Sequence, residues 1–173
     1  MISYNQTFIT VITWVGIVDT TILMILLSRS FFLWIKGVSP SLIRLGNGLA
    51  KRKIAIFAKG DNVTSLRSLL IDSGLFKSKN IFEVAKMDDI GKADQGSVYL
   101  VYWHDWAADI DEILRNKPDK CALIVYAPYD LGRIPDEEMK KLDGKRHSAV
   151  TNFRGRLLND IVTSMITTTY DSK

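Results

Sequence analysis

The residues best suited to chemistry in this 173-residue chain stand directly after short apolar runs, which are typical of buried strands. Lys59 follows the first run, and Arg154 and Arg156 follow the last. Their cationic groups could hold a phosphate, helped by backbone N–H groups where the next helix begins. The predicted ligand-binding residues are Lys59, Gly60, Asp61, Asn62, His104, Asp105, Arg154 and Arg156.

Each part of this predicted phosphate site also has a structural interpretation. Asp61 or Asn62 as the N-cap of the following helix would explain the first loop without a ligand. The single glycine of that loop matches neither the dinucleotide-binding pattern nor the Walker pattern. Arg154 and Arg156 could pair with acidic residues of a neighbouring loop. The sequence leaves these interpretations open.

Catalysis and metal binding find little support in the residue types. The pair His104-Asp105 suggests acid–base chemistry, because histidine titrates near neutral pH. No serine or cysteine stands at a recognisable spacing from this pair, and Cys121 begins an apolar run. One cysteine and two histidines exclude an internal disulfide and a cysteine-based zinc site. We therefore predict no nucleophilic triad, no metal and no cofactor.

Apolar runs that alternate with helical patterns must position these residues. The predicted strands cover 54–58, 81–85, 98–103, 122–127 and 148–152, and the predicted helices cover 63–75, 87–93, 106–115, 136–142 and 157–166. Such β–α units predict an α/β fold with an open parallel five-stranded sheet of flavodoxin-like order 2-1-3-4-5. Ligands of such sheets bind beyond the carboxyl ends of the strands, where Tyr129 and Asp130 also lie.

Residues 53–170 resemble a response-regulator receiver domain in length and in the order of their elements. Receivers carry an acidic pair after the first strand, where this chain has Lys59-Gly60-Asp61-Asn62 with one acid. Tyr102 or Trp103 stands at the phosphoacceptor position, with Asp105 close by, and Asn152-Phe153-Arg154 lacks the receiver lysine. The resemblance therefore implies the fold without the phosphorelay chemistry.

The same region resembles a TIR-like signalling domain. TIR enzymes that cleave NAD carry a glutamate on the helix after the third strand, and Glu112 is the nearest match here. This resemblance implies that Glu112 is catalytic. The alternative is that Glu112 belongs, with Asp109 and Asp111, to a solvated helix face.

The N-terminal segment predicts a membrane-spanning helix. Residues 8–28 read FITVITWVGIVDTTILMILLS and contain a single charge. As a helix these 21 residues are about 31 Å long, close to the thickness of the hydrocarbon core of a bilayer. A secretory signal peptide would need a basic start and a small-residue cleavage site, which are missing. A buried core helix would have to be apolar on every face.

The basic residues predict the orientation of this span. No lysine or arginine precedes it, whereas Arg29 and Lys36 follow it closely. The positive-inside rule then places the N-terminus outside and the C-terminal domain in the cytoplasm, as a single-pass protein of the cell inner membrane. Breaking residues such as Gly37 and Pro40 divide the chain into three predicted parts. Residues 1–36 form the span and an interfacial segment, residues 37–52 form a basic linker, and residues 53–173 form the cytoplasmic α/β domain.

The charge distribution argues against a nucleic-acid partner. Residues 1–53 carry a net charge of +5, whereas the remaining 120 residues carry −1. The domain therefore lacks the phosphate attraction that supplies affinity for nucleic acid. The basic residues beyond the span would instead be attracted to anionic lipid.

Asp19 makes the predicted span unusual, because a carboxylate inside a bilayer costs a few kcal/mol and normally faces a partner or a cavity. Thr13, Gly16 and Thr20 lie on one side of the helix with Asp19 at the edge of this strip, and small residues at such spacing allow helices to approach closely. We predict that the span self-associates there. The alternative is a monomeric anchor in which neutral Asp19 is bonded to its own backbone.

These observations predict a membrane-anchored signalling or effector protein. Its partners would be the bilayer, further copies of the chain, and either a protein or a nucleotide signal that the α/β domain senses. The general plan resembles membrane-tethered cyclic-nucleotide sensors of bacterial antiviral defence, which implies a change in membrane permeability as the output. The alternatives are a tethered TIR-like NAD hydrolase with Glu112 at its centre, and a passive membrane-tethered adaptor.

Overall fold

The structure, a computed structural model, describes the backbone of residues 2–168. Side chains are described for residues 6, 8–40, 42–43, 46 and 51–168, so the side chain of Arg44 and the C-terminal end of the predicted 53–173 domain lie outside the described residues. The chain forms two compact units, Met1–Ile43 and Arg44–Lys173.

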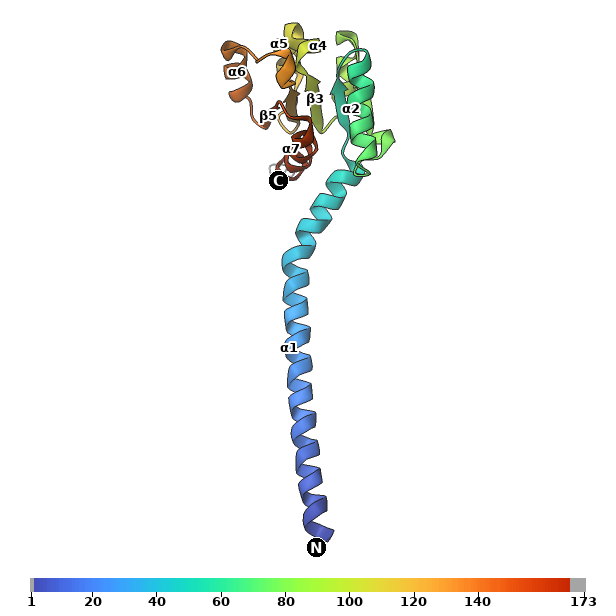
Figure 1. Cartoon of the computed structure of the whole chain (residues 1–173), viewed down its shortest axis with the longest axis vertical. Helices are drawn as coiled ribbons and strands as arrows, with labels where there is room; N and C mark the ends of the chain where they lie inside the picture. The colour runs from blue at the N-terminus through green and yellow to red at the C-terminus, as the bar shows by residue number, and fades with distance from the viewer. Residues whose placement is uncertain (1, 169–173) are drawn as a thin grey trace. The chain divides into compact units, whose positions relative to one another are not determined.

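The second unit is built on the predicted sheet, with all neighbouring strands parallel and in the order β2-β1-β3-β4-β5 (Figure 1). This is the flavodoxin-like order, which confirms the predicted fold class. The strands are β1 (Ile54–Phe57), β2 (Ile81–Val84), β3 (Val98–Tyr102), β4 (Ala122–Tyr126) and β5 (Ser148–Thr151). The helices between and after them are α2 (Asp61–Asp72), α3 (Ile90–Ala93), α4 (Trp103–Trp106), α5 (Ile110–Asn116), α6 (Asp136–Asp143) and α7 (Arg154–Thr167), with short 3₁₀ turns at 78–80, 87–89, 107–109 and 129–131.

Two apolar cores lie on opposite faces of the sheet. Alternate residues of β1 point to opposite faces, so that Ile54 and Ile56 pack under α2 and α7, whereas Phe57 packs on the other face under α5 and α6. Every residue of β1, β3 and β4 is buried. This two-sided burial explains why these strands are continuous apolar runs rather than alternating patterns.

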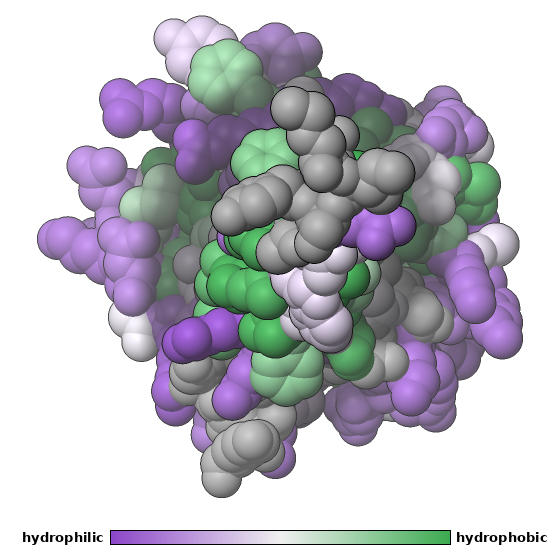
Figure 2. Space-filling view, turned by 90° about the horizontal axis from the view of Figure 1, so that it is seen from below, coloured by the Kyte–Doolittle hydropathy of each residue, from purple (hydrophilic) through white to green (hydrophobic). Residues whose placement is uncertain are grey.

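The first unit consists of the helix α1 (Ile2–Lys51) as far as Ile43. The last turns of this helix belong to the second unit. Every residue from Phe8 to Gly37 is exposed, and the segment Phe8–Pro40 is long and apolar enough to cross a bilayer by its length and composition. Apolar side chains (green) surround the helix in the end-on view of Figure 2.

Gly37 and Pro40, which the sequence marks as breaking residues, do not end the helix, because α1 continues through both of them. A proline inside a helix removes one backbone hydrogen bond and costs about 3 kcal/mol, and a glycine costs about 1 kcal/mol. These costs weaken a helix locally but do not forbid it where many helical residues lie on both sides. The residues of the predicted linker up to Lys51 are therefore helical.

Candidate functional site

Asp105, in the short helix α4 after β3, bonds to the loop after β1 and to the first turn of α2, at the carboxyl edge of the sheet. Its Oδ2 accepts a hydrogen bond from the backbone N–H of Lys59 at 2.7 Å. Asn62 Nδ2 lies 3.2 and 3.1 Å from the two carboxylate oxygens. The carboxylate of Asp105 therefore engages the backbone N–H of Lys59 and the side chain of Asn62, two of the predicted ligand-binding residues.

Lys59 is engaged by groups of the protein itself. Its ammonium lies 4.0 Å from Asp109 Oδ2 and 4.8 Å from the centroid of the Trp106 ring. Trp106 is fully buried and packs edge-on against Phe57. A cation placed over an indole face is attracted to the ring, so Lys59 is held by both a charge and an aromatic surface.

The predicted N-cap of the helix after β1 is wrong. Gly60, rather than Asp61 or Asn62, occupies the cap position of α2, and no side chain caps it. Gly60 has φ 54° and ψ −132°, a conformation that a residue with a side chain rarely adopts. Asp61 lies in the first turn, where the helix dipole favours a negative charge, and Asn62 bonds to Asp105 instead.

The two arginines after β5 do not converge on one ligand position. Arg154 Nη1 donates to Ser65 Oγ and Arg154 Nη2 donates to the Ser65 carbonyl, both at 2.9 Å, so this guanidinium ties α7 to α2. Arg156 Nε lies 3.4 Å from Asp160 Oδ1 on the same helix, with an exposed side chain. In the part of the chain that the structure describes, neither arginine pairs with an acid of a neighbouring loop, which is the pairing that the structural interpretation expected.

Tyr102 and Tyr126 end the neighbouring strands β3 and β4. Their rings meet edge-on, with centroids 5.7 Å apart. Burial raises the pKa of Tyr102, and the negative charge of Asp105 raises it further, whereas Arg154 acts in the opposite direction. His104 is exposed beside Tyr102, with ring centroids 6.3 Å apart. Within the described residues, His104 has no hydrogen-bond partner that would orient it for acid–base chemistry.

The remaining candidates for catalysis lie apart from this edge or are exposed. Cys121 is buried before β4 at the opposite edge of the sheet, and burial raises the pKa of its thiol to about 12. Glu112 is exposed on α5, next to Asp111, whose carboxylate pairs with Lys141 at 3.0 Å. Among the residues that the structure describes, no group of histidine, cysteine and carboxylate side chains could hold a metal ion.

The sequence reasoning missed an apolar surface on the loops after β4 and β5. Tyr129, Leu131 and Phe153 are the most exposed large apolar residues described in the α/β domain, at 73, 52 and 63%. These loops are neighbours, because β4 pairs with β5 and Ala127 N donates to the Thr151 carbonyl. We call Tyr129, Leu131 and Phe153 the edge patch.

A cavity of about 590 Å³ adjoins the edge patch. Tyr129, Arg133 and Asn152 are among its polar lining residues, and Ile134 and Met139 contribute apolar surface. Gly132, with φ 101°, turns the loop that forms one wall. The proline-bounded sequence PYDLGRIP at 128–135 was the signal for a shaped loop here.

The strip on α1 has a carboxylate, Asp19, that no described residue of the chain satisfies. Asp19 makes no hydrogen bond or ion pair with any residue that the structure describes, so it is not bonded to its own backbone. The hydroxyls of Thr13 and Thr20 donate to the carbonyls of Ile9 and Gly16, at 2.8 and 2.7 Å. A Cβ added to Gly16 would meet open space.

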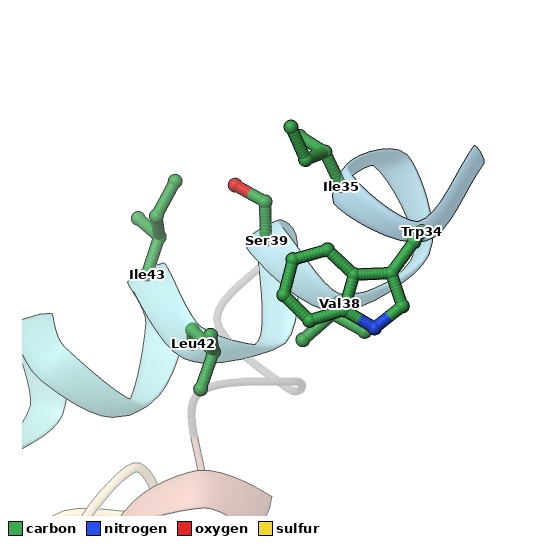
Figure 3. A pocket seen from close by; sticks show the side chains of 6 residues that line it. All are labelled: Trp34, Ile35, Val38, Ser39, Leu42 and Ile43. Carbon is green, nitrogen blue, oxygen red and sulfur yellow. The ribbon is translucent and has the colours of Figure 1, made fainter. Parts of the chain in front are cut away.

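The C-terminal part of α1 also carries an apolar hollow (Figure 3). It lies between two rows of side chains that step along the same helix in i, i+4 spacing, and is lined by Trp34, Ile35, Val38, Ser39, Leu42 and Ile43. Because these residues all come from one helix, the hollow is an open surface rather than an enclosed ligand cavity.

Comparisons of the chain with protein families, curated proteins and solved structures gave no match.

Proposed function

We propose that this chain is a single-pass membrane signalling or effector protein, whose cytoplasmic α/β domain senses a protein partner and controls self-association of the α1 spans. The observation that carries the proposal is Asp19, an acidic residue in an exposed apolar helix that has no partner among the residues described by the structure. Val15, Ile22 and Leu23, one helical turn away from it, are apolar and exposed.

Self-association would satisfy Asp19 at low cost. A carboxyl group facing lipid is unfavourable, so a second span that offers a polar contact is stabilised against the monomer. Gly16 leaves room for close approach, and the hydroxyl oxygens of Thr13 and Thr20 can still accept from a protonated carboxyl of a neighbouring copy. Assembled spans would then bring their Asp19 side chains together, and a change in membrane permeability is the output we propose.

A protein partner fits the carboxyl edge of the sheet better than a nucleotide does. The predicted phosphate ligands Lys59 and Arg154 are held by the protein itself. The edge patch offers exposed Tyr129 and Phe153 beside a cavity that Arg133 lines, and tyrosine and arginine are common energetic centres of protein interfaces. The positive-inside rule supports placing this edge in the cytoplasm, on the inner membrane.

The test compares wild type with Asp19→Leu in lipid. We expect the wild type to form oligomers in nanodiscs and to make vesicles leak dye once the partner is bound. The variant should remain monomeric and cause no leakage. Thr21→Leu, which makes a similar apolar change outside the strip, should behave as wild type. A monomeric wild type, or an Asp19→Leu protein that assembles and leaks normally, would contradict the proposal.

A further inference from the structure

The segments that lead into the strands are strongly basic. Each segment runs from the end of the preceding helix to the start of the next strand, and the second one includes the 3₁₀ turn at 78–80. The segments are 52–53, 73–80, 94–97, 117–121 and 144–147. They contain only two acids, Asp94 and Asp119. Their eight bases are Arg52, Lys53, Lys77, Lys79, Lys117, Lys120, Lys145 and Arg146.

These segments form one continuous face, which we call the amino edge, because all the strands are parallel and begin on the same side. Backbone hydrogen bonds join neighbouring segments directly. Ser97 N donates to the Lys53 carbonyl at 2.8 Å, Ala122 N to the Ser97 carbonyl at 3.0 Å, and Leu123 N to the His147 carbonyl at 2.8 Å. The segments before β1, β3, β4 and β5 are therefore neighbours, and among them the bases lie before β1, β4 and β5.

Much of this positive charge is not neutralised within the protein. Lys77, Lys79, Lys120 and Lys145 form no ion pair with any residue that the structure describes, and all are exposed. Lys145 also lines a depression of about 500 Å³ between α5 and α6, together with Arg115, Lys140 and Lys141 and one acid, Asp111, which pairs with Lys141. Burial lowers the pKa of Lys117, Cys121 and Asp119 act in the opposite direction, and the charge of Lys145 lowers it again.

The opposite edge of the sheet, the carboxyl edge, has a net negative charge in the segments that follow the strands. The segments that follow the strands, 58–60, 85–89, 103–109, 127–135 and 152–153, contain five acids and three bases. The near-neutral total charge of the domain therefore hides a separation of charge between its two edges. Helix dipoles favour bases in the last turn of a helix, as for Lys140 and Lys141 on α6, but the bases of the amino edge stand outside the helices.

We propose that the amino edge binds anionic phospholipid headgroups. This inference rests on the proposed insertion of α1 into the membrane. Pro40 and Lys53 are separated by 13 residues, so the chain holds the amino edge within about 45 Å of the end of the span even if fully extended. A basic surface on so short a tether can reach the bilayer, and it is attracted to anionic lipid once it comes within a Debye length, roughly 10 Å, of the membrane surface. Docking through the amino edge directs the acidic edge and the edge patch away from the lipid.

The test uses the full chain in two kinds of vesicle, phosphatidylcholine alone and phosphatidylcholine mixed with phosphatidylglycerol. Backbone hydrogen exchange is measured for residues 117–121 and 144–147. We expect several-fold slower exchange in the anionic vesicles than in phosphatidylcholine, with the difference lost at high salt. Equal exchange in both lipids would overturn the proposal.

Two charge-matched variants separate lipid docking from a general effect of charge. Lys120→Glu with Lys145→Glu, at the amino edge, should abolish the lipid-dependent protection. Lys86→Glu with Arg133→Glu, at the carboxyl edge, should leave it intact; the same loss in both pairs would overturn the proposal. A chain that fails to insert, yet binds anionic vesicles through Lys120 and Lys145, would refute the proposed span and support the docking surface.

Discussion

Asp105 connects two loops that the sheet alone would leave side by side without a polar link. It accepts one backbone and one side-chain hydrogen bond from the loop after β1. Losing a charged acceptor strands both donors, which costs about 1–3 kcal/mol. We expect Asp105→Ala to lower the free energy of unfolding of the α/β domain by that amount, measured in detergent by tryptophan fluorescence.

Asp130 is the matched control for this substitution. It is an exposed aspartate on the same edge of the sheet, so Asp130→Ala removes the same charge without removing the link between loops. Its effect should stay within about 0.5 kcal/mol. Equal effects of the two variants would show that the charge of the edge, rather than the Asp105 hydrogen bonds, stabilises the domain.

Cys121 is predicted to be an unreactive thiol that makes the domain sensitive to alkali. Its pKa of about 12 lies above the ordinary value of 9.0, so the unfolded state loses the proton first. Stability is then fully present below pH 9 and falls as the pH rises toward 12, by roughly 1.4 kcal/mol per pH unit from this group. Wild type should therefore lose more stability than Cys121→Ala between pH 9 and pH 10.5.

A thiol reagent gives an independent measurement on the same residue. At pH 8 the folded chain should react slowly with a maleimide, and denaturant should make the reaction fast, because the thiolate is the reactive species. Fast labelling of the folded chain would mean that the start of β4 is not the closed core that the structure shows.

At the scale of elements, Arg154 fixes how α7 lies beside α2. Its two hydrogen bonds to Ser65 need the planar fork of a guanidinium, which lysine lacks. We expect Arg154→Lys to lower the melting temperature of the domain, with a loss of about 1 kcal/mol for a hydrogen bond that cannot be replaced.

Arg156→Lys tests whether any arginine at the start of α7 has this effect. Arg156 makes an exposed ion pair with Asp160 on its own helix, and exposed pairs contribute about 0–1 kcal/mol. The melting temperature should therefore be unchanged. A larger loss from Arg156→Lys than from Arg154→Lys would reject the role given to the contact between α7 and α2.

The elements of the α/β domain were largely readable from the sequence, because burial on both faces leaves a clear pattern. The run IAIFA and the later run ALIVYA have no polar residue to interrupt them, and both became central strands. The continuous α1 was not readable, since Gly37 and Pro40 are strong breaking signals whose cost depends on the helix around them.

The sequence predicted which edge of the sheet carries the candidate residues, but it did not predict the contacts that these residues make. Lys59, Asn62 and Asp105 follow strands whose order could be anticipated, so their common edge was predictable. Whether Asp105 would bond to the first loop depends on the directions of the side chains, which the spacing of residues along the sequence does not determine. The edge patch was missed because single apolar residues in loops, such as Leu131 and Phe153, carry no periodic signal.

At the scale of the whole molecule, the α/β domain contains all the residues of both cores. The described cores begin at Ile54 and end at Met165, and none of their members belongs to Met1–Ile43. We expect a chain that lacks residues 1–43 to be soluble and to unfold in one cooperative transition, with a melting temperature within a few degrees of the full chain in detergent. Calorimetry checks this, and aggregation or a non-cooperative transition would count against it.

The placement of Lys59 over the buried Trp106 ring gives the domain an intrinsic optical probe. Indole emission depends on the charges and polarity around the ring, and the Lys59 ammonium is a charge 4.8 Å from the centroid. Any molecule that draws Lys59 away would alter the emission wavelength of Trp106. In a chain whose other three tryptophans, Trp14, Trp34 and Trp103, are replaced by phenylalanine, a shift of the emission wavelength on titration would then detect occupation of the loop after β1.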